Sequence, residues 1–149
     1  MLMRLLVGAL ICAAAGDDRV VAAEPALGQA IGPVELVTHD GRPLTMKNYD
    51  ERPATAVLFL SPRCPVTEGA ISEIAALNQK YRRRDVLFVG IVPDASVTNA
   101  EISELIQTRG VVFPIYRDAE GTVAKQFGAT LTPEVYLLDG DSRVIYHGG

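Results

Sequence analysis

Two apolar runs in the middle of the chain predict the centre of the fold. Residues 54–60 and 86–92 are almost entirely apolar or small, as is typical of strands that are buried on both faces of a sheet. Between them, apolar residues recur every three or four positions, which predicts a helix over 66–81. A strand, a helix and a strand in this order form a βαβ unit, so we expect the two strands to be parallel with a right-handed crossover.

Turn and capping signals predict the elements on either side of this unit. Asp40 and Gly41 form a tight-turn signal inside residues 34–45, which predicts a hairpin or a pair of extended arms. Thr98 and Glu101 have the spacing of a capping box, so a second helix is expected to begin there.

The last third of the chain predicts a further alternation of short elements. An extended piece over 111–116 is followed by a short helix over 119–127, which Gly128 closes. Residues 134–138 and 143–146 are expected to form two antiparallel strands. The complete pattern predicts an α/β fold with a mixed central sheet that is flanked by helices.

Residues 1–23 have the pattern of a secretory signal peptide. Arg4 gives the segment a positive start, residues 5–15 form an apolar run too short to span a bilayer comfortably, and small residues follow. The sequence therefore predicts an exported protein, periplasmic or extracellular, with one domain over 24–149. No stable membrane span is expected after processing. The other interpretation is a membrane anchor formed by an uncleaved N-terminal segment.

Charge and residue usage exclude several function classes. The formal net charge is -4, and the one basic run, 82–84, falls where the long helix should end, so no nucleic-acid partner is expected. The mature chain has no second cysteine that could complete a set of metal ligands with His39 and His147, so no metal site is predicted. No glycine-rich phosphate loop follows a strand, and no cofactor is expected.

Cysteine usage singles out one thiol. Cys12 lies in the predicted signal peptide, which leaves Cys64 alone and excludes an internal disulfide. Pro65 suits the first position of a helix, so Cys64 should lie at or beside the N-cap, where the helix dipole and free N–H groups favour a thiolate. We expect Arg63 and the Ser61 hydroxyl to support that thiolate. Cys64 is thus a candidate nucleophile, and the other interpretation is an inert structural cysteine.

Four segments resemble a known family in order and spacing. They are similar to thioredoxin-like redoxins of the alkyl hydroperoxide reductase/thiol-specific antioxidant group, which include the peroxiredoxin-like proteins. The resemblance covers about residues 28–149 and is carried by 59–67 (FLSPRCPVT), 113–118 (FPIYRD), 127–129 (FGA) and 132–139 (TPEVYLLD). It implies a thioredoxin fold.

The resemblance also implies a substrate-binding edge. It predicts that the Thr132–Pro133 bond is cis and that Pro133 faces Cys64, where the backbone would meet an incoming substrate. The other interpretation is an ordinary trans proline that opens an edge strand. The implied partners are a peroxide, or a protein or small-molecule disulfide, together with an external thiol reductant.

Three departures from the family pattern limit what can be carried over. Thr67 stands at the second cysteine position of C-x-x-C, so the mature chain has no resolving thiol. Val57 replaces the proline of the peroxiredoxin motif, and Pro133 stands about where its arginine is expected. The chain stops at Gly149, where the family usually has a further helix. We therefore expect a fold that lacks the C-terminal helix, a chain truncated at that end, and an apolar patch beside 135–137.

Two function classes follow from these residues. The first is an exported thiol-dependent oxidoreductase or antioxidant in which Cys64 attacks a peroxide or a disulfide. The product would be a sulfenic acid or a mixed disulfide that an external thiol resolves. The alternative is a non-catalytic thioredoxin-fold module with a binding or structural role.

Overall fold

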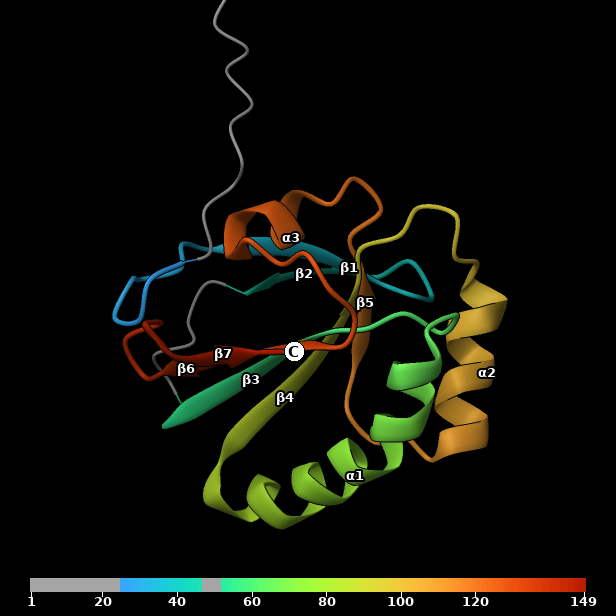
Figure 1. Cartoon of the computed structure of the whole chain (residues 1–149), viewed down its shortest axis with the longest axis horizontal. Helices are drawn as coiled ribbons and strands as arrows, with labels where there is room; N and C mark the ends of the chain where they lie inside the picture. Colours follow the sequence, from blue (N-terminus) through green and yellow to red (C-terminus); the bar gives the residue numbers. More distant parts are fainter. Residues whose placement is uncertain (1–24, 47–51) are drawn as a thin grey trace, which may run out of the picture.

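A computed structural model of the chain describes residues 25–46 and 52–149 (Figure 1). The predicted signal peptide, with Cys12, lies outside the described residues. The described strands form one mixed sheet in the order β2-β1-β5-β4-β3-β6-β7. The strands are β1 (Val34–Thr38), β2 (Pro43–Met46), β3 (Ala54–Phe59), β4 (Val86–Val92), β5 (Ile115–Arg117), β6 (Glu134–Asp139) and β7 (Val144–Gly148). The helices are α1 (Pro65–Tyr81), the short 3₁₀ helix η2 (Arg82–Arg84), α2 (Asn99–Arg109) and α3 (Thr122–Phe127).

The centre of the sheet is the predicted βαβ unit. β3 and β4 are parallel and adjacent, with Val57 opposite Val89, and α1 connects them. β6 pairs with β3 in the antiparallel direction, so that Glu134 at the start of β6 lies opposite Phe59 at the end of β3. This register brings the beginning of β6 to the same edge of the sheet as the turn that leads into α1. The candidate active site lies at that edge.

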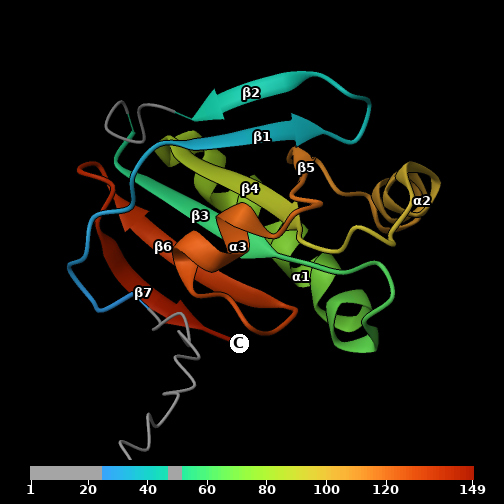
Figure 2. The same cartoon turned by 90° about the horizontal axis from the view of Figure 1, so that it is seen from above.

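Helices cover the two faces of the sheet unequally (Figures 1 and 2). On the face of α3, Phe59, Phe127 and Tyr136 pack edge to face with ring centroids 5.3 to 5.7 Å apart. On the face of α1 and α2, Leu58 and Ile71 belong to a second buried cluster. Both faces of β3 are therefore buried, as its continuous apolar sequence predicts.

Most of the predicted boundaries are confirmed within one or two residues. The hairpin at Asp40 and Gly41 forms from β1 and β2. The capping box at the start of α2 is complete, because Thr98 and Glu101 each accept a hydrogen bond from the other's backbone N–H. Gly110 ends α2 with a left-handed φ of 63°, a conformation that glycine adopts without a steric penalty.

Two elements differ from the sequence-based expectation. The helix expected over 119–127 begins only at Thr122, because Gly121 has a left-handed φ of 64° and Ala124 N–H donates to the Asp118 carboxylate at 2.8 Å. The extended piece expected over 111–116 forms a strand only where it pairs with β4 and β1, over Ile115–Arg117.

The surface beside β6 and β7 is apolar only in part, so it matches the expected apolar patch only in part. Val135 and Leu137 are half-buried on the α1 face, and Tyr146 of β7, opposite Leu137, is 56% exposed. Tyr136 instead points to the α3 face and is fully buried, so it adds nothing to the patch. Among the described helices, none is long and apolar enough to cross a membrane.

Candidate active site

Cys64 lies at the N-cap of α1, as the sequence predicts. Its backbone is extended, with φ −91° and ψ 118°, and Pro65 follows at the first helical position. The Cys64 N–H donates to the Ser61 carbonyl at 3.1 Å, and the Cys64 carbonyl accepts from Glu68 N–H at 3.0 Å. This tight turn fixes the thiol beside the N–H groups of the first helical turn, which have no partner within the helix.

The helix N-terminus lowers the pKa of the Cys64 thiol below its ordinary value. The largest cause is the backbone N–H of Thr67; the N–H of Val66 and the hydroxyls of Thr67 and Thr132 act in the same direction, whereas burial opposes them. In the protonated state the thiol makes no capping hydrogen bond to these groups. They act instead by favouring the negative charge that forms when the proton leaves.

The thiol also contacts the segment that enters β6. The Thr132–Pro133 bond is cis, as the family resemblance implies, and the Cys64 S–H donates to the Thr132 carbonyl at 2.9 Å. That contact by itself favours the protonated thiol. The donors around the sulfur outweigh it, so the net shift of the Cys64 pKa is downward. Two segments 68 positions apart in sequence thus meet at one sulfur atom.

Arg63 binds α2 and the segment before it, whereas the sequence predicts that it lies against the thiolate. Its guanidinium forms a bidentate pair with the Glu101 carboxylate, at 2.7 and 3.0 Å, and donates to the hydroxyl and the carbonyl of Ser96, each at 2.9 Å. The planar guanidinium matches this carboxylate and carbonyl pair better than a single sulfur atom. Arg63 therefore ties the turn at Cys64 to the beginning of α2.

Ser61 likewise has a different role from the one expected. Its hydroxyl accepts a hydrogen bond from Arg63 N–H at 3.3 Å, and within the described part of the chain it makes no hydrogen bond to Cys64. Thr67 supplies the hydroxyl instead, and its side chain is fully buried. Thr67 could have been identified from its position three residues into the helix that Cys64 caps, where backbone N–H groups are free.

Glu134 is the second residue that the sequence analysis missed. Its side chain is only 3% exposed, yet both carboxylate oxygens have partners. One accepts from the backbone N–H groups of Thr130 and Leu131 at 2.9 and 3.1 Å, and the other accepts from the Tyr136 hydroxyl at 2.8 Å. The carboxylate thereby holds the segment that carries the Thr132 carbonyl. An acidic residue at the start of an otherwise apolar strand is the signal that could have found it.

Comparison with known proteins decides the family. The model of the AhpC/TSA family matches residues 27–147. The chain belongs to the AhpC/TSA family. The thiol-disulfide oxidoreductase ResA of Bacillus thuringiensis subsp. konkukian is 23% identical over 106 residues, which cover 71% of this chain and 60% of ResA. The chain thus spans about 60% of the length of the curated relatives that it matches.

Solved structures confirm the thioredoxin-like α/β fold of this AhpC/TSA chain. The hypothetical protein SMc02350 of Sinorhizobium meliloti aligns with a TM-score of 0.78 and 27% identity, over 85% of this chain and 72% of that one. The peroxidoxin BcpB of Mycobacterium tuberculosis aligns with a TM-score of 0.71 and 20% identity, over 85% of this chain and 86% of that one. At 20% identity the similarity to BcpB shows the fold alone.

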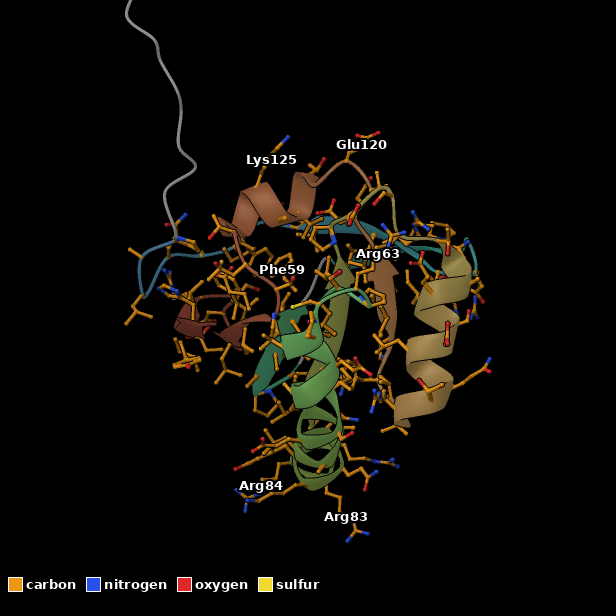
Figure 3. The ribbon with its side chains drawn as sticks, turned by 45° about the vertical axis from the view of Figure 1, so that its right-hand side comes forward. Phe59, Arg63, Arg83, Arg84, Glu120 and Lys125 are labelled. Carbon is orange, nitrogen blue, oxygen red and sulfur yellow. The ribbon has the colours of Figure 1, made fainter. Side chains whose placement is uncertain are left out.

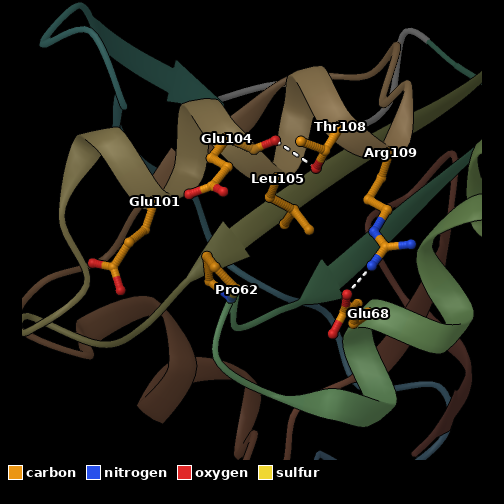
Figure 4. Close-up of a pocket in the computed structure, with 7 residues that line it drawn as sticks. All are labelled: Pro62, Glu68, Glu101, Glu104, Leu105, Thr108 and Arg109. Carbon is orange, nitrogen blue, oxygen red and sulfur yellow. Dashed lines mark hydrogen bonds and ion pairs between the residues drawn. The ribbon is translucent and has the colours of Figure 1, made fainter.

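A polar cavity borders the active-site turn of the AhpC/TSA domain (Figure 4). It has a volume of 380 Å³ and lies between α1 and α2, with Pro62 of the turn at its wall. Glu68 of α1 forms an ion pair with Arg109 of α2 across it. Together with Arg63, this pair joins α1 and the turn before it to α2 at two places. No group of three metal-binding side chains comes together within the described residues.

Proposed function

We propose that the chain is an exported thiol-dependent oxidoreductase in which Cys64 is the nucleophile and disulfides are the preferred substrate. One observation carries the proposal. Cys64 is the N-cap residue of α1, where N–H groups lower the pKa of its thiol, and its sulfur lies 2.9 Å from the backbone carbonyl of Thr132. A polarised thiol beside an accessible backbone edge is what thiol–disulfide exchange requires.

The reaction proceeds in two exchanges. The Cys64 thiolate attacks one sulfur of a disulfide, a Cys64–S bond forms, and the other sulfur leaves as a thiolate that takes up a proton. An external thiol then attacks the mixed disulfide in the same manner and releases Cys64. The second thiol comes from outside because Thr67 occupies the position of a resolving cysteine.

The loop at Thr132 and Pro133 favours a disulfide over a peroxide. Once the Cys64 proton has left, the Thr132 carbonyl beside the sulfur can accept a hydrogen bond from the backbone N–H of an extended substrate that carries the scissile disulfide. Within the described residues, no arginine or lysine forms a hydrogen bond with Cys64, and Arg63 is bound to Glu101 and Ser96. A peroxide attacked at Cys64 would leave a sulfenic acid and an alcohol or water, without a cation to stabilise the departing oxygen.

Export is supported by the signal-peptide pattern of residues 1–23. The ResA relatives are named thiol-disulfide oxidoreductases, and one solved structure with 15% identity is described as a secreted disulfide oxidoreductase of Mycobacterium tuberculosis. N-terminal sequencing of the protein recovered from the extracytoplasmic fraction tests this part. A protein retained in the cytoplasm with Met1 intact would contradict it.

Product analysis tests the chemistry. The Cys12→Ser variant, in which Cys64 is the only thiol, is mixed with one equivalent of a small aromatic disulfide. We expect one equivalent of aromatic thiol to appear, with a mass increase on Cys64 that an added dithiol reverses. The additional change Cys64→Ser should abolish both signals. If Cys64 exchanges no faster than a cysteine in an unstructured peptide, the non-catalytic binding module becomes the correct interpretation.

A further inference from the structure

The end of α1 opposite Cys64 borders a second cavity, distant from the thiol. It forms where the last turn of α1, the start of β4 and the segment before β5 meet, and its volume is 220 Å³. Figure 3 shows Arg83 and Arg84 at this end of the molecule and Arg63 near the other. The lining includes Arg52, Asn78, Arg82, Phe88, Val112 and Phe113.

Asn78 brings an unpartnered polar group to this cavity. Its residue surface is 93% buried, since only 7% is exposed. Within the described part of the chain, its side-chain amide has no hydrogen-bond partner. Among the described residues, the Thr55 hydroxyl is the fully enclosed side-chain polar atom without a partner, so the Asn78 amide is reached by solvent from the cavity, where it can both donate and accept. The cavity therefore contains an unused hydrogen-bonding group of a kind that ligands satisfy.

The rim of the cavity is positively charged. Arg52 pairs with Asp85, whereas Arg82 forms no ion pair with any described residue. The carboxyl end of α1 carries a partial negative charge that works against an anion. The full charge of the Arg82 guanidinium exceeds that partial charge, and its planar fork matches a carboxylate.

The inner wall of the cavity is apolar. The rings of Phe88 and Phe113 pack at 6.2 Å between centroids and are both buried. Val112 lies beside them and is 55% exposed, which is high for a large apolar residue. A ligand with an apolar body would cover Val112 while its polar end met Asn78 and Arg82.

We infer that this cavity binds a small carboxylate with an apolar body. Arg82 pairs with the carboxylate, the Asn78 amide donates to it, and the body lies against Val112 and Phe113. The volume of 220 Å³ is below that of pockets for drug-sized ligands and suits a body of about one aromatic ring. Such a carboxylate occurs in free organic acids and at the C-terminus of a peptide that ends in an apolar residue.

Side-chain amide NMR of the full chain tests the inference. Phenylacetate represents the free acid, N-acetyl-phenylalanine represents a peptide C-terminus, and phenylacetamide is the uncharged control. We expect saturable shifts of the Asn78 side-chain amide and the Arg82 Nε–H signals with one or both carboxylates, and none with phenylacetamide. Shifts with phenylacetate alone assign the site to free acids, and shifts with N-acetyl-phenylalanine extend it to peptide ends.

Matched arginine variants complete the test. Arg82→Gln should weaken carboxylate binding about tenfold or more, because it removes a charge-assisted hydrogen bond. Arg84→Gln, which changes the same charge outside the cavity lining, should leave the affinity unchanged. The inference is overturned if neither carboxylate shifts the Asn78 signals, if phenylacetamide shifts them equally, or if both variants weaken binding alike.

Discussion

The two segments that meet at the Cys64 sulfur are held in place in different ways. The turn over 61–67 is held by Pro65 at the first helical position, by backbone hydrogen bonds between residues a few positions apart, and by Arg63, which ties it to the beginning of α2. The segment over 130–134 is fixed by the buried carboxylate of Glu134, which binds two backbone N–H groups and the Tyr136 hydroxyl. The two segments therefore have different functions. The turn sets the ionisation of the thiol, and the buried carboxylate sets the position of the backbone edge beside the thiol.

The largest expected effect follows from removing that carboxylate. Glu134→Ala leaves the Thr130 and Leu131 N–H groups without this acceptor and removes the carboxylate that the Tyr136 hydroxyl binds, which should lower the free energy of unfolding by about 3 kcal/mol. Exchange of Cys64 with disulfides should slow, because the Thr132 carbonyl is no longer held in place. Denaturant unfolding and exchange kinetics measure the two effects.

Glu134→Gln is the matched control, since its amide oxygen can still accept from the Thr130 and Leu131 N–H groups. It should retain most of the stability and most of the exchange rate. If Glu134→Ala is as stable and as fast as the wild-type protein, the carboxylate does not position the segment, and the comparison between the two segments fails.

Removing a second buried polar group should change the stability in the opposite direction. The Thr55 hydroxyl on β3 is buried and, within the described residues, has no hydrogen-bond partner. Replacing it by a methyl group in Thr55→Val should raise the free energy of unfolding by about 1 kcal/mol, because an unsatisfied polar atom leaves the core. Urea unfolding of Thr55→Val measures this. A loss of stability would show that the hydroxyl has a partner in the folded protein.

The third prediction concerns the turn alone. Thr67→Val removes the hydroxyl that lowers the pKa of Cys64 but keeps the Thr67 N–H, the larger cause. The pKa of Cys64 should therefore rise without returning to its ordinary value. Ser61→Ala is the control and should leave the pKa unchanged, because the Ser61 hydroxyl bonds to Arg63 N–H. Equal shifts in both variants would restore the role that the sequence predicted for Ser61.

The smallest expected effect is that of Arg63→Gln on the thiol. Because the Arg63 guanidinium binds Glu101 and Ser96, its removal should leave the pKa of Cys64 unchanged and lower Tm slightly. Hydrogen bonds from the Arg63 guanidinium, and after them from the Thr98 N–H and hydroxyl, lower the pKa of Glu101 to about 2 from its ordinary value of 4.5. A depressed carboxylate pKa contributes stability above pH 4.5 that is lost as the pH falls toward 2. The Tm difference between wild type and Arg63→Gln should shrink over that range.

The sequence predicts the fold and the place of Cys64 at a helix N-terminus better than it predicts what surrounds the thiol. The strands 54–60 and 86–92 and the helix at Cys64 follow from local apolar patterns and from Pro65, which act over a few residues. The cis bond at Pro133 came from the family resemblance. The partner of Arg63 could not be predicted, because Glu101 lies 38 positions away and only the packed fold brings the two together. Glu134 was missed although its partners, Thr130, Leu131 and Tyr136, are only two to four positions away, because the three hydrogen bonds form only when the loop before β6 is folded.

The pKa of Cys64 tests the central claim most directly. The rate of alkylation of the Cys12→Ser variant by iodoacetamide is followed from pH 4 to 10, the variant with Cys64→Ser added being the blank. The account predicts a single titration with a midpoint below the free-thiol value of about 8.5, and fast alkylation near neutral pH. A midpoint at or above that value, with slow alkylation, would contradict this account and show that the N-terminus of α1 does not activate the thiol.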